Sequence, residues 1–141
     1  MLETNMRVLV VDDLRVMRKI VIHLLEEIGV KYIDTAENGE EALELLRKET
    51  YHLVLSDWKM PVLDGIGLLK ALRADEKLKH ILFIIVTSEG AEAHVKTAIE
   101  AGVDGYIVKP LSANTLEQKL LDASESRQID IASDQPADDG E

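Results

Sequence analysis

Charged and hydroxyl side chains stand at the carboxyl ends of four short apolar segments of this chain. Asp12 and Asp13 follow the first segment, Asp57 follows the third, Thr87 follows the fourth and Lys109 follows the fifth. Clustered carboxylates raise one another's pKa unless positive charge lies nearby. Carboxylate oxygens without cysteine or histidine ligands suit Mg²⁺, which keeps several waters and leaves positions open. Together with Lys109 and the Thr87 hydroxyl, such an ion would bind a phosphoryl group.

Each of these residues also has an ordinary explanation when it is taken alone. Asp13 could cap the following helix, Asp12 could be a turn residue, and Asp57 could be a cap or a surface acid. Thr87 is a common strand residue, and Lys109 before Pro110 could be a solvated lysine at a turn. The combination favours a functional site, because all four segment ends carry residue types that one reaction needs.

Five apolar segments recur along the chain, and they predict strands. The first, third and fourth are almost continuous in Val, Ile and Leu, which is typical of strands buried on both faces of a parallel sheet. The second alternates more and fits an edge strand. The segments are Arg7–Val11, Lys31–Thr35, His52–Ser56, Ile81–Val86 and Tyr106–Val108.

Between and after these segments lie stretches with the apolar period of amphipathic helices. They cover about 17–28, 38–49, 64–73, 90–101 and 113–123. Gly29 and Gly102 are predicted stops, and Asn38 with Glu41 has the spacing of a capping box. Regular alternation of strand and helix predicts an α/β fold, a doubly wound five-stranded parallel sheet of flavodoxin-like order 2-1-3-4-5 with five helices. In that order the acidic strand ends are neighbours at the switch point, where ligands bind.

Composition limits the remaining function classes. The 141 residues include 27 acids and 16 bases, for a net charge of −11, and 46% are hydrophobic. The hydrophobic content excludes a wholly disordered chain, and the acidity argues against nucleic acid or an anionic membrane as partner. The longest apolar run is Ile81–Val86, too short for a membrane span. The start of the chain shows no signal peptide, so we expect a cytoplasmic protein. We also expect the protein to be a monomer.

The chain is expected to divide into one domain, 1–123, and a disordered acidic tail, 124–141. Zero cysteines exclude disulfides and thiolate chemistry. The turn Asp12-Asp13-Leu14-Arg15 would repel a flavin phosphate, and Gly65-x-Gly67 is only a weak nucleotide-loop signal. The histidines have no ligand spacing and are expected on the surface; they are His23, His52, His80 and His94.

These motifs resemble the response-regulator receiver domain of two-component signalling, and most closely the single-domain chemotaxis regulators of the CheY type. The resemblance covers about residues 5–122. Its matching motifs are Val10-Val11-Asp12-Asp13, Ser56-Asp57-Trp58-Lys59-Met60-Pro61, Asp64-Gly65, Val86-Thr87, Ala101-Gly102-Val103-Asp104-Gly105-Tyr106 and Lys109-Pro110.

The resemblance implies a role for each matched residue. Asp57 is the phosphoacceptor for a sensor histidine kinase, and Mg²⁺ is held by Asp12, Asp13, Asp57 and the backbone carbonyl of Lys59. Thr87 and Lys109 bind the phosphoryl group, and the Lys109–Pro110 bond is cis. Thr87 and Tyr106 form a switch that alters an effector-binding face of the fourth helix, fifth strand and fifth helix, with the flagellar motor switch as one candidate effector. Without the resemblance, Tyr106 could equally be an ordinary strand aromatic.

The favoured function is therefore a phosphoacceptor signalling protein, which is not an enzyme beyond self-catalysed phosphoryl transfer and autodephosphorylation. The alternative is a phosphorelay intermediate or phosphate sink without a dedicated effector. A Mg²⁺-dependent phosphohydrolase is a third possibility, but it needs an acid where Lys59 stands. The sequence departs from the chemotaxis pattern at Lys59, Gly90-Ala91-Glu92, Leu111 and the acidic tail, which leaves the effector open. We also hypothesise that Glu89 pairs with Lys59; two solvated side chains are the alternative.

Overall fold

A computed structural model describes residues 5–88 and 90–127 of the chain, and in them strands and helices alternate without exception. The strands are β1 (Arg7–Val11), β2 (Tyr32–Ala36), β3 (Leu53–Ser56), β4 (Leu82–Thr87) and β5 (Gly105–Val108). The helices are α1 (Arg15–Glu27), α2 (Gly39–Lys48), α3 (Gly65–Ala74), α4 (Glu92–Glu100) and α5 (Ala113–Arg127).

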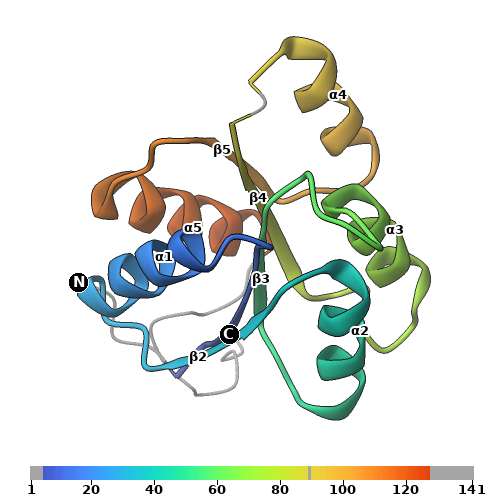
Figure 1. Cartoon of the computed structure of the whole chain (residues 1–141), viewed down its shortest axis with the longest axis horizontal. Coiled ribbons are helices and arrows are strands. Elements are labelled where there is room, and N and C mark those ends of the chain that lie inside the picture. Colours follow the sequence, from blue (N-terminus) through green and yellow to red (C-terminus); the bar gives the residue numbers. More distant parts are fainter. Residues whose placement is uncertain (1–4, 89, 128–141) are drawn as a thin grey trace, which may run out of the picture.

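The strands form one parallel sheet in the order β2-β1-β3-β4-β5, which confirms the predicted topology. Alternate side chains of each strand point to opposite faces. Val8 and Val10 therefore pack with α1 and α5, whereas Leu9 and Val11 pack with α2 and α3. Figure 1 shows the resulting three layers, with α1 and α5 on one side of the sheet. β2 lies at an edge, as its weaker apolar pattern predicts.

Helix ends differ from the predictions by two residues or more in three places. α1 begins at Arg15, two residues earlier than predicted. α4 begins at Glu92, two residues later than predicted, and its N-cap, Ala91, makes no side-chain cap hydrogen bond. α5 continues to Arg127, four residues beyond the predicted end, and Ala123 and Ser124 are buried. The helix thus covers the first residues assigned to the acidic tail, and 128–141 lie outside the described residues.

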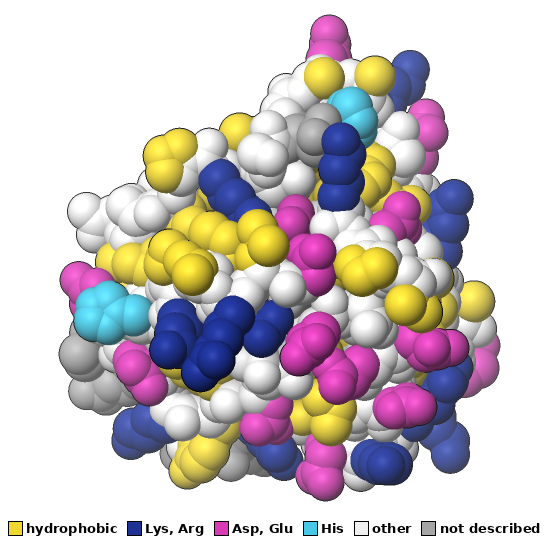
Figure 2. Space-filling model, viewed as in Figure 1, with side chains coloured by type: hydrophobic (Ala, Val, Ile, Leu, Met, Phe, Trp, Pro, Cys, Tyr) yellow, Lys and Arg dark blue, Asp and Glu magenta, His cyan; other side chains and the backbone are white. Residues whose placement is uncertain are grey.

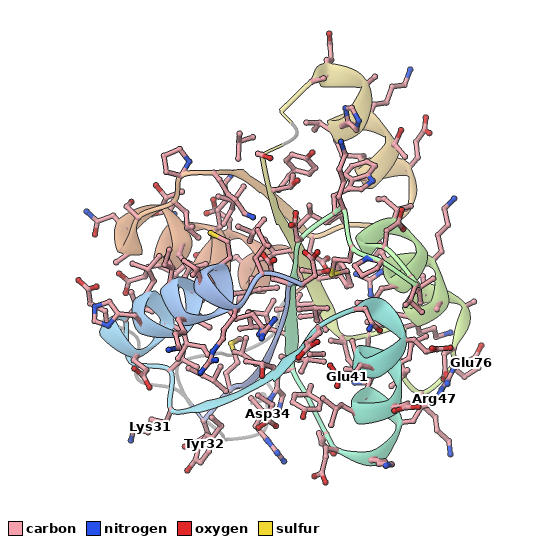
Figure 3. The ribbon with its side chains drawn as sticks, viewed as in Figure 1. Lys31, Tyr32, Asp34, Glu41, Arg47 and Glu76 are labelled. Carbon is pink, nitrogen blue, oxygen red and sulfur yellow. The ribbon has the colours of Figure 1, made fainter. Side chains whose placement is uncertain are left out.

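The start of α2 shows how local sequence sets a helix boundary. The Asn38 side chain accepts a hydrogen bond from the Glu41 amide at 2.9 Å, as the predicted cap requires. The Glu41 carboxylate accepts from the amide of Glu37 at 2.6 Å, one residue before the amide that a capping box uses. Glu41, labelled in Figure 3, lies in the first turn of α2. In the described part of the chain, no helix could cross a bilayer.

Candidate functional site

Backbone hydrogen bonds at the carboxyl edge of the sheet hold the acidic residues beside one another. The Asp57 amide donates to the Val11 carbonyl at 2.9 Å, and the Asp12 amide donates to the Ala36 carbonyl at 3.1 Å. The first residue after β1 and the first residue after β3 therefore continue the hydrogen bonding between the strands. This extension places the side chains of Asp12 and Asp57 at the same edge, where the strand order reverses.

Three carboxylates gather at this edge. Ligand oxygens of Asp12, Asp13 and Asp57 all lie within 4.8 Å of one another, and among the described residues this is the one such group of three acidic or histidine side chains. Lys109 reaches the group from the end of β5. Its ammonium lies 3.4 Å from Asp12 Oδ2 and 3.6 Å from Asp57 Oδ2. The sequence-predicted acids and lysine are thus brought together.

Asp12 is the most enclosed member of the group. Burial raises the pKa of its carboxyl, the Leu14 amide and Lys109 oppose this rise, and the charge of Asp57 adds to it. The Leu14 amide donates to Asp12 Oδ1 at 2.9 Å, and the Arg18 guanidinium donates to the Asp12 carbonyl at 2.7 Å. Asp12 is therefore held in one orientation although its charge is costly. Asp13 is exposed and does not cap α1, because the N-cap is Leu14.

Asp57 is oriented by the loop that follows it. The Trp58 amide donates to Asp57 Oδ1 at 2.7 Å, while Oδ2 faces Lys109. The Gly65 amide donates to the Trp58 carbonyl at 2.7 Å, and a Cβ on Gly65 would collide with the Asp57 carbonyl oxygen. A glycine is needed at 65 so that the start of α3 can close against the loop.

The donor set fits a divalent cation. Three carboxylates and one ammonium leave a net charge of −2 at the site if all are ionised, which a divalent ion would neutralise. All of the side-chain donors are oxygens, the ligands that Mg²⁺ takes, and the partly exposed Asp13 and Asp57 leave room for water. Lys59, whose carbonyl was the fourth predicted ligand, follows Asp57 on the same loop with its side chain exposed.

Thr87 and Tyr106 lie on neighbouring strands beside this group. Thr87 is buried at the end of β4, and its carbonyl accepts from the Lys109 amide at 2.8 Å. The Lys109–Pro110 peptide bond is cis, as predicted. Tyr106 is half-buried and lies edge-on to Trp58, with ring centroids 6.4 Å apart. It therefore packs inward in this structure rather than standing free on the sheet edge.

Two of the histidines do not lie fully on the surface, so that prediction was wrong for them. His52 Nδ1 accepts from the Arg7 amide at 2.9 Å, and His94 lies edge-on to Trp58 at 5.1 Å between centroids. Both are half-buried, whereas His23 and His80 are exposed. The sequence contains no signal for these two contacts, because each joins residues that lie far apart along the chain. Glu89, the predicted partner of Lys59, lies outside the described residues.

A separate groove opens at the opposite edge of the sheet, between the end of α2 and the α3–β4 connection. Its volume is about 640 Å³, and Tyr51, Leu78 and Ile81 form part of its lining. Arg47 and Glu76 also line it, and Figure 3 shows both on that side of the molecule. Its lining includes none of the three clustered carboxylates.

Comparison with known proteins shows which family this chain resembles. The response regulator receiver domain profile matches residues 8–121. Chemotaxis protein CheY-3 of Vibrio cholerae serotype O1 is 45% identical over 119 residues, covering 84% of this chain and 92% of the relative. Chemotaxis protein CheY of Pseudomonas aeruginosa is 41% identical over 115 residues, covering 82% and 93%. The solved structure of the chemotaxis response regulator CheY4 of Vibrio cholerae superimposes with a TM-score of 0.78 at 32% identity, covering 85% of this chain and 99% of the other.

Proposed function

The chain belongs to the response regulator receiver domain family, with the character of a CheY-type chemotaxis regulator, and we propose that it is a binding protein switched by phosphorylation of Asp57. One observation carries the proposal above the others. Asp57 stands beside two further carboxylates and 3.6 Å from Lys109, at the switch point of the sheet. This arrangement supplies a carboxylate nucleophile with an ammonium group beside it.

The reaction is transfer of a phosphoryl group from a phosphohistidine of a sensor kinase. One Asp57 carboxylate oxygen forms a bond to phosphorus while the P–N bond of the donor breaks, and the electron pair stays on the imidazole nitrogen. The Trp58 amide fixes the other carboxylate oxygen, so the attacking oxygen is presented in one direction. Lys109 and the Thr87 hydroxyl donate to the oxygens of the transferred group.

The metal site of the proposal uses Asp12, Asp13, Asp57 and the backbone carbonyl of Lys59. Mg²⁺ bound there supplies electrostatic neutralisation of the phosphoryl oxygens. The protein's own contribution is to hold the carboxylates in place, through the Leu14 and Trp58 amides, against their mutual repulsion. Hydrolysis of the aspartyl phosphate at the same site would end the signal, so self-catalysed phosphoryl transfer and autodephosphorylation are the only reactions proposed.

The output is assigned to the α4–β5–α5 face, where phosphorylation would act through Thr87 and Tyr106. Two large apolar side chains are exposed on it, Ile99 of α4 at 63% and Val108 of β5 at 46%. An effector protein would cover these two side chains, whereas a phosphate sink would leave them exposed. The effector is proposed to be a protein of the chemotaxis system, with the flagellar motor switch as the leading candidate, and the site of action is proposed to be the cytoplasm.

Acetyl phosphate with Mg²⁺ tests the proposal without a cognate kinase. The intact mass should increase by one phosphoryl group, hydroxylamine should remove it, and EDTA should prevent it. Asp57→Asn should abolish the adduct, while Asp64→Asn, which changes the N-cap of α3, should retain it. A hydroxylamine-stable adduct that persists in Asp57→Asn would contradict the assignment. Steady turnover of small phosphomonoesters would instead favour a phosphohydrolase.

A further inference from the structure

Three aromatic rings connect the loop after Asp57 with α4 and β5. The Trp58 ring meets His94 of α4 at 5.1 Å and 80°, and Tyr106 of β5 at 6.4 Å and 73°. Both pairs have the edge-to-face geometry and the spacing at which aromatic rings attract. All three rings are half-buried. One indole is therefore shared between the helix and the strand of the proposed output face.

Trp58 is the fixed member of this group. Its amide donates to Asp57 Oδ1 at 2.7 Å, and its carbonyl accepts from Gly65 at 2.7 Å. Its ring also packs against the apolar core between the sheet and α2, α3 and α4. A change at Asp57 would therefore reach the Trp58 peptide directly, and through the indole it would reach the two ring partners.

α4 is the least anchored helix whose burial is described along its whole length. Ala98 is its one buried residue, whereas α1 has two and α3 has five. Its N-cap, Ala91, makes no side-chain hydrogen bond. Figure 1 shows α4 projecting at one end of the molecule. In the first half of α4, His94 and Val95 are half-buried, and the His94 ring, one helical turn before Ala98, contacts Trp58.

We propose that His94 is a positioning residue for the output of the phosphorylation site, which holds the first half of α4 on Trp58 so that α4 and Tyr106 respond together to Asp57. This inference rests on the proposed function. A single edge-to-face pair is weak enough to be broken or remade when phosphorylation changes contacts by a comparable amount. Deleting the ring should leave phosphoryl transfer intact, since His94 is not among the carboxylates or their hydrogen-bond partners, and should uncouple α4 from it.

Hydrogen exchange measured by mass spectrometry tests the proposal on the full-length protein. His94→Gln removes the ring, is a good helix former and keeps a polar side chain, while His94→Phe restores a ring. His80→Gln is the matched control, because His80 is exposed on the α3–β4 connection. Each protein is examined before and after acetyl phosphate with Mg²⁺, and intact mass gives the phosphorylated fraction.

In His94→Gln we expect the α4 amides to exchange about 2- to 10-fold faster before phosphorylation, the range that loss of one aromatic pair implies. Phosphorylation should then change exchange in β5 but no longer in α4. Wild type, His94→Phe and His80→Gln should show coupled changes in both. Wild-type behaviour of His94→Gln, or failure of Phe to restore coupling, would overturn the proposal. If none of the four proteins accepts a phosphoryl group, both the proposed function and the output role of His94 are contradicted. Hydrogen exchange of the unphosphorylated proteins then still tests the contact between His94 and Trp58.

Discussion

At the scale of single residues, Asp12 belongs to the candidate site, but its charge lowers the stability of the fold. Its carboxylate is buried next to Asp57, and burial raises its pKa. A raised native pKa means that the folded protein favours the protonated acid more than the unfolded chain does. Ionised Asp12 therefore destabilises the fold above the unfolded pKa of about 3.9. The charge of Asp12 therefore serves the candidate site at a cost to the stability of the fold.

Asp12→Asn should consequently stabilise the metal-free protein at pH 7 by on the order of 1 kcal/mol, the usual scale of a single substitution. The amide oxygen of Asn can still accept from Leu14, so the local geometry is kept. The gain should shrink as pH falls through the raised pKa of Asp12 in the folded protein, and it should vanish below the unfolded pKa of about 3.9. Urea unfolding in EDTA across pH 4–7 measures this difference. A variant less stable than wild type at pH 7 would contradict the burial argument.

Val62 carries backbone strain in the loop between the site and α3. Its φ is +71°, the Leu63 amide donates to the Pro61 carbonyl at 2.7 Å, and the side chain is 73% exposed. A β-branched residue is unfavourable in this γ-turn, whereas Asn tolerates positive φ. Val62→Asn should therefore stabilise the protein by about 1 kcal/mol. Thermal melts should show no comparable gain for Val16→Asn, an exposed helical control; equal shifts would refute strain as the cause.

The sequence predicted the carboxylates, Thr87 and Lys109 as one group because parallel strand ends share an edge of the sheet. It did not predict the contacts of His94 and His52. Their partners, Trp58 and Arg7, are more than thirty residues away, and the spacing of residues within one helix or strand does not identify so distant a partner. Such contacts depend on packing between elements, which single-sequence spacing does not contain.

At the scale of elements, Arg73 at the end of α3 joins two connections, α3–β4 and α4–β5. Its guanidinium donates to the carbonyls of Gly102 at 3.0 Å, Lys79 at 2.9 Å and Ile81 at 2.8 Å. It also pairs with Asp104 at 2.7 Å, and the same Asp104 oxygen accepts from the Phe83 amide at 2.8 Å. The group thereby fixes the start of β4, whose far end carries Thr87, and the turn before β5, whose second residue is Tyr106.

Arg73→Met should destabilise the protein by about 3 kcal/mol, because it leaves the largely buried Asp104 without its cation. Arg73→Lys should recover only part of this, since an ammonium cannot reproduce the planar fork. Chemical denaturation of both variants, with Asp104→Asn completing a double-mutant cycle, separates the pair from the carbonyl contacts. Additive effects of Arg73→Met and Asp104→Asn would show that the two side chains do not act together.

The type and order of the elements could be predicted from apolar periodicity. Helix ends could be predicted only where a specific residue sets them. Asn38 and Gly29 mark their ends correctly, the latter with φ of +104°. α5 has no such signal, and its acidic composition after residue 123 suggested a tail. Burial of Ala123 and Ser124 extends the helix beyond that point, which is a tertiary effect that composition does not report.

At the scale of the whole molecule, the net charge of −11 is unevenly distributed. In Figure 2, basic side chains gather over α1 and acidic ones over α2. Arg15 and Lys19 are exposed on α1, and Glu40, Glu41 and Glu44 on α2. The acidic group at the switch point adds to the general repulsion, so a bound divalent cation should stabilise the entire fold.

Mg²⁺ should raise the unfolding free energy of wild type by about 2.7 kcal/mol when its concentration is 100 times the dissociation constant. Asp13→Asn should lose most of this gain, because it removes an exposed ligand without disturbing the buried Asp12. NaCl at matched ionic strength controls for screening. Thermal melts provide the measurement, and equal stabilisation of wild type and Asp13→Asn would place the ion elsewhere.

Chemical trapping of the phosphorylated residue tests the central claim most directly. Borohydride reduces an aspartyl phosphate to homoserine, so protein treated with acetyl phosphate and Mg²⁺ can be reduced, digested and mapped by mass spectrometry. Homoserine should appear at position 57 alone, and only in samples that contained Mg²⁺. Homoserine at position 12 or 13, or a phosphoryl group that resists borohydride on a histidine or hydroxyl side chain, would contradict the assignment of Asp57 as the phosphoacceptor.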